Sequence, residues 1–233
     1  MTESHVTLIT GGGTGIGAAT ARELLAAGRK VAITGRRQDR LDQVAKELGE
    51  PDGLLTIAGD ASDYGHVEAA VRATVERFGR LDAVVANAGG AKGRSVADSD
   101  PDDMREMVLT NVLGPAYLIR AALPELTNSK GRIVIVGSVA GFVNTPGNLY
   151  GATKWAMTGL AENTRRLVSS DGVGVTLIAP GATESDFWEH IGTPDYPHML
   201  TSEDIGRAIV WAVSQPYGVD VNTMVVRPIG QAN

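Results

Sequence analysis

The sequence predicts an α/β fold built on a doubly wound parallel sheet of about seven strands, with helices on both faces. Two observations lead to this fold class. Short apolar segments alternate with helix-like segments along the whole chain, and a glycine-rich turn joins the first apolar segment to the first helix. The composition does not change along the 233 residues, so we expect a single domain spanning residues 1–233.

Strands are expected where short apolar runs occur, and helices where helix-forming residues lie between them. In such folds ligands bind at the carboxyl ends of the strands, so the residues after each strand are candidates for a site. The apolar residues of 67–78 recur every three or four positions, which gives that helix one face to pack on the sheet. The expected strands are 6–9, 30–34, 54–58, 83–86, 133–136, 173–178 and 223–226. The expected helices are about 18–25, 38–48, 67–78, 101–126, 149–168 and 205–212.

The overall composition excludes several function classes. The formal net charge is -6 and the basic residues are scattered, so we expect no nucleic-acid surface. The chain has no uninterrupted apolar run of about 18 residues and no basic and apolar leader, which favours the cytoplasm and argues against a membrane span. Because there is no cysteine and the four histidines lack metal-site spacing, we expect no disulfide, thiolate nucleophile or metal.

The glycine-rich turn from Thr10 to Gly17 is the first candidate site. A diphosphate can bind at such a strand-to-helix turn, because glycines let the backbone approach the phosphates and the N–H groups of the helix start point at the anion. This is the binding arrangement of a Rossmann-type fold. A flexible turn without a ligand is the alternative. The residues predicted to hold the diphosphate are Gly11, Gly13, Thr14, Gly15, Ile16 and Gly17.

The residues after the second strand indicate which dinucleotide binds. Arg36 and Arg37 stand where a dinucleotide-binding fold usually has an acid for the adenosine ribose, and no acid occurs before Asp39. Two guanidinium groups can instead pair with a 2′-phosphate through charge-assisted hydrogen bonds, which favours NADP(H) over NAD(H) as the cofactor. A pair of solvated arginines at the start of a helix is the alternative.

Two further strand ends are expected to contact the cofactor. After the third strand, Asp60 can accept a hydrogen bond from the adenine amino group, although Ser62 or Asp63 can also cap a helix there. After the fourth strand, small residues leave room for a flat ring or a ribose, although an ordinary turn has the same composition. The residues predicted from these two strand ends are Asp60, Ala61, Asn87, Ala88 and Gly89.

The candidate catalytic residues follow the fifth strand. Ser138 ends this strand, and Tyr150 and Lys154 come twelve and sixteen residues later. Their spacing of four residues places Tyr150 and Lys154 on one face of a helix. The structural alternatives are a tyrosine with its ring in the core, a lysine that reaches the surface and a serine that forms a turn.

In these motifs the sequence resembles the short-chain dehydrogenases/reductases over essentially its whole length. The resemblance implies that Asn111, Ser138, Tyr150 and Lys154 form a catalytic tetrad. It also implies that the glycine turn holds the diphosphate and that the two arginines select NADP(H). The spacing from Ser138 to Tyr150 is one residue shorter than is commonest in the family, so the loop between them must follow a tighter path. The shared motifs are Thr10-Gly11-x-x-x-Gly15-Ile16-Gly17, Asn87-Ala88-Gly89, Asn111, Ser138, Tyr150-x-x-x-Lys154 and Pro180-Gly181.

Physical chemistry gives the four tetrad residues distinct roles. Hydride transfer to a carbonyl leaves an alkoxide that must be protonated, and Tyr150 can act as the acid, or as the base in the reverse direction. The Lys154 ammonium and the positive nicotinamide of the oxidised cofactor are expected to lower the pKa of Tyr150. Ser138 is expected to donate to the developing oxyanion. By resemblance, Lys154 also binds the nicotinamide ribose, and Asn111 holds a water that links Lys154 to solvent.

The nicotinamide end of the cofactor site is expected after the sixth strand. By resemblance, Pro180 and Gly181 contact the cofactor, and either Thr183 or Ser185 bonds the nicotinamide carboxamide. The C-terminal residues 222–228 resemble the branch of the family that acts on small hydroxy-acid or keto substrates.

A substrate lid is expected at about residues 183–200, where the family carries one. The aromatic residues Phe187, Trp188 and Tyr196 favour an apolar wall that closes over the nicotinamide. An ordinary surface loop anchored by aromatic residues is the alternative.

These motifs together predict an NADP(H)-dependent carbonyl reductase or alcohol dehydrogenase that acts on a small molecule. Trp155 and Met157 lie on the helix with which family members pair their subunits, which favours a homo-oligomer, a dimer or tetramer, although core packing also explains both residues. One alternative is a non-catalytic NADP(H) sensor that binds a protein partner, but a sensor does not need the paired tyrosine and lysine. A second is an epimerase or dehydratase of the extended family, for which the chain is too short to carry the added substrate domain.

Overall fold

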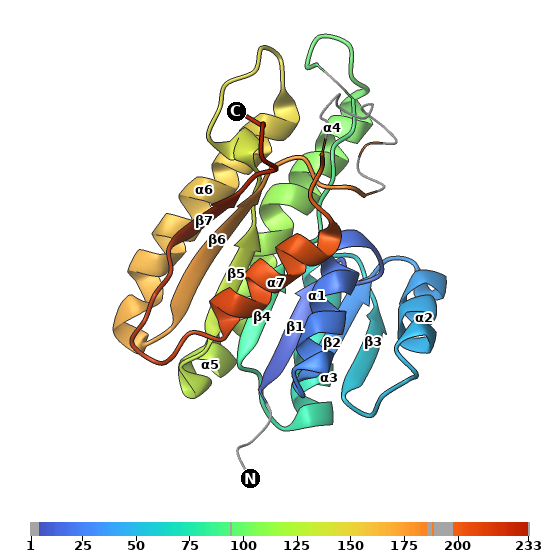
Figure 1. The fold of residues 1–233 in the computed structure, drawn as a ribbon, viewed down its shortest axis with the longest axis vertical. Coiled ribbons are helices and arrows are strands. Elements are labelled where there is room, and N and C mark those ends of the chain that lie inside the picture. The colour runs from blue at the N-terminus through green and yellow to red at the C-terminus, as the bar shows by residue number, and fades with distance from the viewer. Residues whose placement is uncertain (1–4, 94, 186–187, 189–197, 233) are drawn as a thin grey trace.

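The computed structural model describes residues 5–93, 95–185, 188 and 198–232. At its centre lies a sheet of seven parallel strands in the order β3-β2-β1-β4-β5-β6-β7 (Figure 1). The order reverses at β1, between β2 and β4, and ligands bind at such switch points in open α/β sheets. The predicted α/β fold class is therefore confirmed. The strands are β1 (Val6–Thr10), β2 (Lys30–Gly35), β3 (Leu54–Ala58), β4 (Ala83–Ala86), β5 (Arg132–Val136), β6 (Gly174–Pro180) and β7 (Thr223–Val226).

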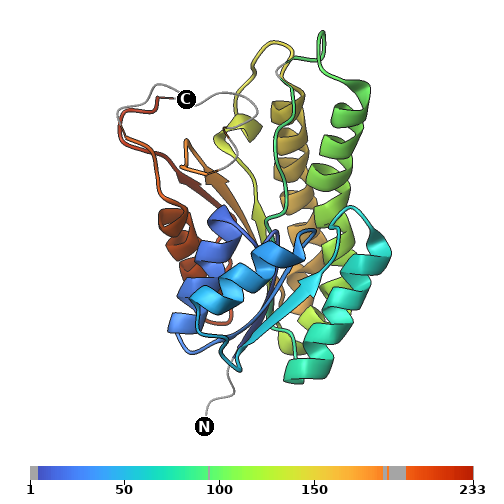
Figure 2. The same ribbon diagram turned by 90° about the vertical axis from the view of Figure 1, so that its right-hand side faces the viewer.

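Helices pack on both faces of the sheet, as Figure 2 shows from the side. One face is covered by α1, α2 and α7, and the other by α3, α5 and α6. The predicted helices are all present, and α1, α3 and α7 begin three residues before their predicted starts. The helices are α1 (Gly15–Ala26), α2 (Gln38–Glu47), α3 (Tyr64–Phe78), α4 (Pro101–Val108), α5 (Gly114–Ser129), α6 (Leu149–Val168) and α7 (Ser202–Val213).

One apolar core lies on each side of the sheet, and successive residues of β1 contribute to different cores. Leu8 packs in the core beneath α3, α5 and α6, and Ile9 in the core beneath α1, α2 and α7. Both side chains are fully buried, which explains why the strands read as continuous apolar runs. Met157 is 1% exposed in the first of these cores, so core packing explains this residue, whereas Trp155 is 43% exposed.

The expected helix over 101–126 is interrupted. After α4, five residues form a π-helix, Leu109–Leu113, before α5 begins at Gly114. The whole run, Pro101–Ser129, is long and apolar enough to cross a membrane by length and composition. Its α5 part buries Leu118 and Leu126 in the core against the sheet, which is the ordinary place of such a helix in an α/β domain.

Candidate active site

The glycine turn presents a helix N-terminus at the carboxyl end of β1. The first helical hydrogen bond of α1 runs from Ala18 N to Thr14 O at 3.2 Å, so the N–H groups of Gly15 to Gly17 precede the helical pattern. The first turn reads Gly-Ile-Gly-Ala and contains no acidic residue. Among the described residues the Thr14 side chain makes no capping bond. This helix start is therefore suited to hold an anion.

The residues after β4 hold this turn in place. Gly11 has φ +67°, and a Cβ added there would lie 2.9 Å from both Ala88 Cα and Asn87 Nδ2, so the turn requires glycine. Asn87 Nδ2 donates to Thr10 O at 2.9 Å and to Gly11 O at 3.1 Å. Thr10 Oγ1 in turn accepts from Asn87 N and Ala88 N, both at 3.1 Å. The Asn87 amide thus positions the turn, a role that sequence reasoning missed.

The two arginines predicted to bind a phosphate lie immediately after β2. Arg36 is exposed, and its NH1 donates to Glu106 Oε1 on α4 at 2.6 Å. Arg37 is the exposed N-cap residue of α2. The glycine turn lies beside them, because Gly12 N donates to Thr34 O at 2.9 Å. The ion pair with Glu106 could not be foreseen from a sequence separation of 70 residues.

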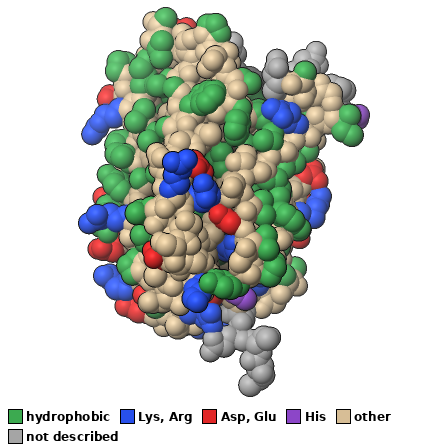
Figure 3. Space-filling model, turned by 90° about the vertical axis from the view of Figure 1, so that its left-hand side faces the viewer, with side chains coloured by type: hydrophobic (Ala, Val, Ile, Leu, Met, Phe, Trp, Pro, Cys, Tyr) green, Lys and Arg blue, Asp and Glu red, His purple; other side chains and the backbone are tan. Residues whose placement is uncertain are grey.

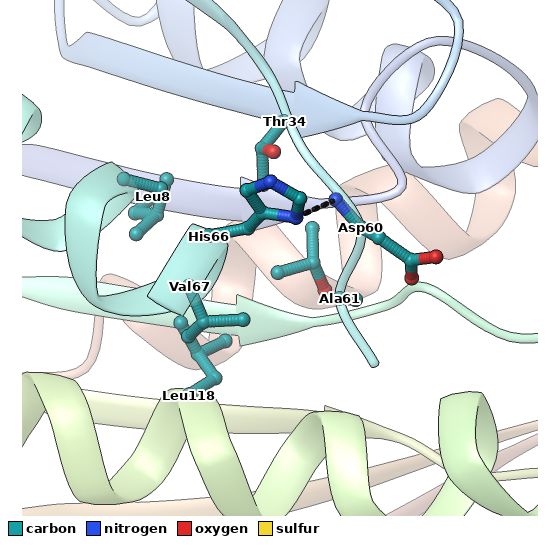
Figure 4. A pocket seen from close by; sticks show the side chains of 9 residues that line it. Leu8, Thr34, Asp60, Ala61, His66, Val67 and Leu118 are labelled. Carbon is teal, nitrogen blue, oxygen red and sulfur yellow. Dashed lines mark hydrogen bonds between the residues drawn. The ribbon is translucent and has the colours of Figure 1, made fainter. Parts of the chain in front are cut away.

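A small cavity near the predicted adenine contact is lined by the loop after β3 together with residues of β1, β2, α3 and α5. Asp60 Oδ1 accepts from Ser62 N at 2.9 Å, and Asp60 N donates to His66 Nδ1 at 3.4 Å (Figure 4). The cavity between Thr34, Ala61 and His66 measures about 10 Å³, so it holds a water molecule at most and no ring. The helix that follows is capped by Asp63, whose Oδ1 accepts from His66 N at 2.9 Å, as one of the two alternatives predicted.

Ser138, Tyr150 and Lys154 meet at the carboxyl end of β5. Tyr150 and Lys154 lie near the start of α6, where Asn148 caps the helix by accepting from Gly151 N at 3.0 Å. The side chains of Ser138 and Tyr150 share a hydrogen bond, so the shorter loop between them still brings them into contact. Lys154 Nζ donates to the carbonyl of Val136, the last residue of β5, at 3.0 Å and lies 5.6 Å from the centroid of the Tyr150 ring.

Burial shifts the pKa values of both Tyr150 and Lys154. Lys154 is 7% exposed, and burial lowers its pKa to about 8. Burial raises the pKa of Tyr150 to about 12, and its hydrogen bond with Ser138 offsets only part of that rise. In the chain by itself the pKa of Tyr150 is thus raised and not lowered, because desolvation of the phenolate outweighs its hydrogen bond with Ser138. The lowering expected from Lys154 together with the oxidised nicotinamide stays a prediction. At neutral pH Tyr150 carries its proton and Lys154 is mostly charged.

Asn111 lies in the π-helix and links the loop after β4 to α6. Its Nδ2 donates to Gly90 O at 2.9 Å and to Thr153 Oγ1 at 3.0 Å, and its Oδ1 accepts from Gly90 N at 3.0 Å. A Cβ added at Gly89 would lie 2.9 Å from Asn111 Oδ1 and 3.7 Å from Lys154 Nζ, so the amide and the ammonium flank this glycine. Both amide hydrogens are used within the chain, which leaves the predicted water contact to the remaining oxygen lone pair or the backbone.

Hydrogen bonds hold the two ends of the segment after β6, near Thr183 and Leu200, close together. Thr183 is buried, and its hydroxyl donates to Gly181 O at 3.0 Å, while Trp188 Nε1 donates to Thr183 O at 2.7 Å. Leu200 N donates to Ala182 O at 2.9 Å, which ties the end of the segment to its beginning. The predicted lid residues Phe187 and Tyr196 fall outside the described residues.

Ser185 lies near the glycine turn. A Cβ added at Gly15 would be 3.7 Å from Ser185 Cβ and 3.8 Å from Ser202 Oγ. The two residues predicted to bond the nicotinamide carboxamide therefore lie in different places. The Thr183 side chain is hydrogen-bonded to Gly181 beside β6, whereas Ser185 lies beside the start of α1.

Comparison with known proteins places this arrangement among enzymes. The family model described as short chain dehydrogenase matches residues 5–195. An uncharacterized oxidoreductase of Staphylococcus epidermidis is 32% identical over 231 residues, which are 97% of this chain and 98% of that protein. An alcohol dehydrogenase of the archaeon Thermococcus sibiricus, solved with 5-hydroxy-NADP, superposes with a TM-score of 0.89 at 29% identity and 99% coverage of both chains. The closed form of a serine dehydrogenase with NADP+ superposes with a TM-score of 0.90 at 30% identity, over 98% of this chain and 96% of that one.

Proposed function

The chain belongs to the short-chain dehydrogenase family, and we propose that it is an NADP(H)-dependent oxidoreductase that interconverts a small carbonyl compound and its alcohol. One observation carries the proposal. The hydrogen-bonded pair of Ser138 and Tyr150, with Lys154 beside it, lies at the carboxyl end of β5, on the same edge of the sheet as the glycine turn. An acid, an oxyanion donor and a cation at that edge support proton transfer to a substrate oxygen.

The residues at the sheet edge fit a dinucleotide. The helix start at Gly15 to Gly17 has N–H groups suited to a diphosphate, and the paired arginines after β2 suit a 2′-phosphate. The nicotinamide, when bound, supplies or accepts the hydride. Two solved relatives carry NADP+ or 5-hydroxy-NADP, which supports NADP(H) for this chain. The residues proposed to hold it are Gly11, Gly13, Thr14, Gly15, Ile16, Gly17, Arg36, Arg37, Asp60, Ala61, Asn87, Ala88, Gly89, Tyr150, Lys154, Pro180, Gly181 and Thr183.

Tyr150 is proposed as the proton donor in reduction. With a pKa of about 12 it is protonated at neutral pH and can give its proton to the oxygen that becomes an alcohol. Such general acid catalysis contributes about 10²- to 10⁴-fold to a rate. In the oxidative direction the same group must accept a proton, so positive charge near the phenol is needed to lower its pKa.

Ser138 and Lys154 support this proton transfer. Ser138 Oγ accepts from Ala140 N at 3.1 Å, which fixes the oxygen beside Tyr150 and leaves its hydroxyl hydrogen to donate to the substrate oxygen or the phenol. Lys154 is held by the Val136 carbonyl, so its charge stays near the tyrosine ring. We propose that Lys154 also binds the nicotinamide ribose, and that Asn111 orients Lys154 through Thr153 and the loop after β4.

The substrate is proposed to be a small alcohol or hydroxy acid. The two solved relatives are an alcohol dehydrogenase and a serine dehydrogenase, whose names support this class. Trp188 is fixed by its indole hydrogen bond to Thr183 O at 2.7 Å, close to the proposed nicotinamide end. We propose that it belongs to the lid that closes over the substrate.

We also propose that the chain is a cytoplasmic homo-oligomer. Figure 3 shows hydrophobic side chains spread over the face that carries the edge strand β7. Large hydrophobic side chains are exposed on α6 at Trp155 and Leu167, on α7 at Trp211 and on β7 at Val225. Apolar surface of this kind is typical of subunit contacts, and sedimentation analysis will give the subunit number.

The experiment that tests the function follows NADPH absorbance with a panel of ketones, aldehydes and keto acids, for the wild type and for Tyr150→Phe. We expect consumption of NADPH by the wild type and its loss in the variant, which keeps the ring but not the acid. If the wild type binds NADPH tightly and consumes none with any substrate, the sensor hypothesis becomes as strong as the enzyme hypothesis, and the next experiment is a search for a protein partner. Full turnover by Tyr150→Phe would refute the catalytic role of Tyr150.

A further inference from the structure

Four charged side chains form a cluster around Glu106. Glu106 Oε1 accepts from Arg36 at 2.6 Å, and Glu106 Oε2 accepts from Lys92. Lys92 Nζ also donates to Asp103 Oδ1 at 2.9 Å. The cluster joins the residue after β2, the loop after β4 and the helix α4. Two of its charges are positive and two are negative, and within it Glu106 is the carboxylate that pairs with Arg36.

This cluster lies at the adenosine end of the proposed cofactor site. Arg36 directly follows β2, and Gly12 of the glycine turn is bonded to Thr34 of the same strand. The helical run that carries Glu106 also touches the loop after β3, because a Cβ added at Gly114 would lie 3.1 Å from Ala61 O. The ion pair therefore connects α4 to one of the two arginines proposed to meet a 2′-phosphate.

The ion pair between Arg36 and Glu106 is exposed enough for Arg36 to exchange its carboxylate partner for a phosphate. The side chain of Arg36 is 62% exposed and that of Glu106 is 39% exposed, and ion pairs at such sites are only weakly favourable. Hydrogen bonds from Lys92 and Arg36 lower the pKa of Glu106, so its carboxylate stays charged at neutral pH. A phosphate dianion that approaches Arg36 meets this carboxylate on the same guanidinium.

We propose that Glu106 is a specificity-determining residue that moderates the preference for NADPH over NADH by competing with the 2′-phosphate for Arg36. The proposal rests on the proposed function. NADH carries no 2′-phosphate, so it does not compete with Glu106. Glu106 does not touch the reacting atoms and acts through Arg36.

The test measures the dissociation constants of NADPH and NADH by fluorescence titration for the wild type and Glu106→Gln. We expect Glu106→Gln to bind NADPH about two- to fivefold more tightly, as is typical for an exposed pair, and NADH within about twofold of the wild type. The gain should shrink at about 0.5 M salt, where exposed charges are screened. In an Arg36→Ala background the same substitution should give no gain, because the competition requires the guanidinium.

Asp103→Asn is the matched control, since it changes the cluster charge equally but removes a carboxylate that contacts Lys92 and not Arg36. We expect it to have less effect on NADPH than Glu106→Gln. An unchanged or weaker NADPH affinity in Glu106→Gln, an equal gain in Asp103→Asn, or a gain that persists without Arg36 would overturn the inference alone. A wild type that binds neither dinucleotide would overturn the proposed function as well.

Discussion

Replacing Lys154 by methionine should change how stability depends on pH. Burial lowers the pKa of Lys154 from 10.5 to about 8, so the folded chain binds fewer protons than the unfolded chain between these values. The charged amine therefore destabilises the fold by about 3 kcal/mol below pH 8, at 1.36 kcal/mol for each pKa unit. This cost is relieved as the pH rises from 8 toward 10.5.

The free energy of unfolding of the wild type should accordingly rise relative to Lys154→Met by about 2 kcal/mol between pH 7 and pH 9.5. Urea unfolding of both proteins at the two pH values measures this difference, and changes in other groups cancel in the comparison. Losing the hydrogen bond to the Val136 carbonyl changes the difference in free energy of unfolding between the two proteins equally at pH 7 and pH 9.5. It therefore does not affect how that difference changes with pH. Lys46→Met removes an exposed lysine of α2 and should follow the wild type. Parallel curves for wild type and Lys154→Met would refute the argument that burial controls this amine.

Three further predictions concern the site and its support. Tyr150→Phe should lower the turnover number about 10²- to 10⁴-fold, as steady-state kinetics will measure, and fluorescence titration should show a much smaller loss of NADPH affinity, because Tyr150 is only one of the residues proposed to hold the cofactor. Arg36→Ala with Arg37→Ala should weaken NADPH binding at least about tenfold and leave NADH unaffected, and equal losses for both dinucleotides would contradict the phosphate assignment. Asn87→Ala should lower the free energy of unfolding by about 2 kcal/mol, because two carbonyls of the glycine turn lose their donor, whereas Asn128→Ala on the exposed side of α5 should leave it unchanged.

The sequence predicted the elements well because each follows a local period. The apolar runs of the strands and the stripe of α3 are visible without tertiary information. The π-helix was missed because the apolar pattern continues through Leu109–Leu113, and the change lies only in the backbone hydrogen bonds.

The contacts that complete the site could not be predicted, because they join distant positions. Asn87 and Thr10 are separated by 77 residues, and Asn111 and Thr153 by 42. Nothing in the local sequence marks these pairs. The raised pKa of Tyr150 was missed for the same reason, since burial depends on the packed fold and not on the neighbouring lysine four residues away.

The hydrogen bonds that join Asn87 to the glycine turn have a consequence for protein engineering. The groups that fix the turn lie at the carboxyl ends of the interior strands β1 and β4, whereas the charged side chains around Arg36 are partly exposed to solvent. If the proposed cofactor site is right, the rigidity of the turn and the choice between NADPH and NADH depend on separate sets of residues. Substitutions at Arg36 and Arg37 should therefore shift the preference from NADPH toward NADH while the hydrogen bonds that hold the glycine turn stay intact.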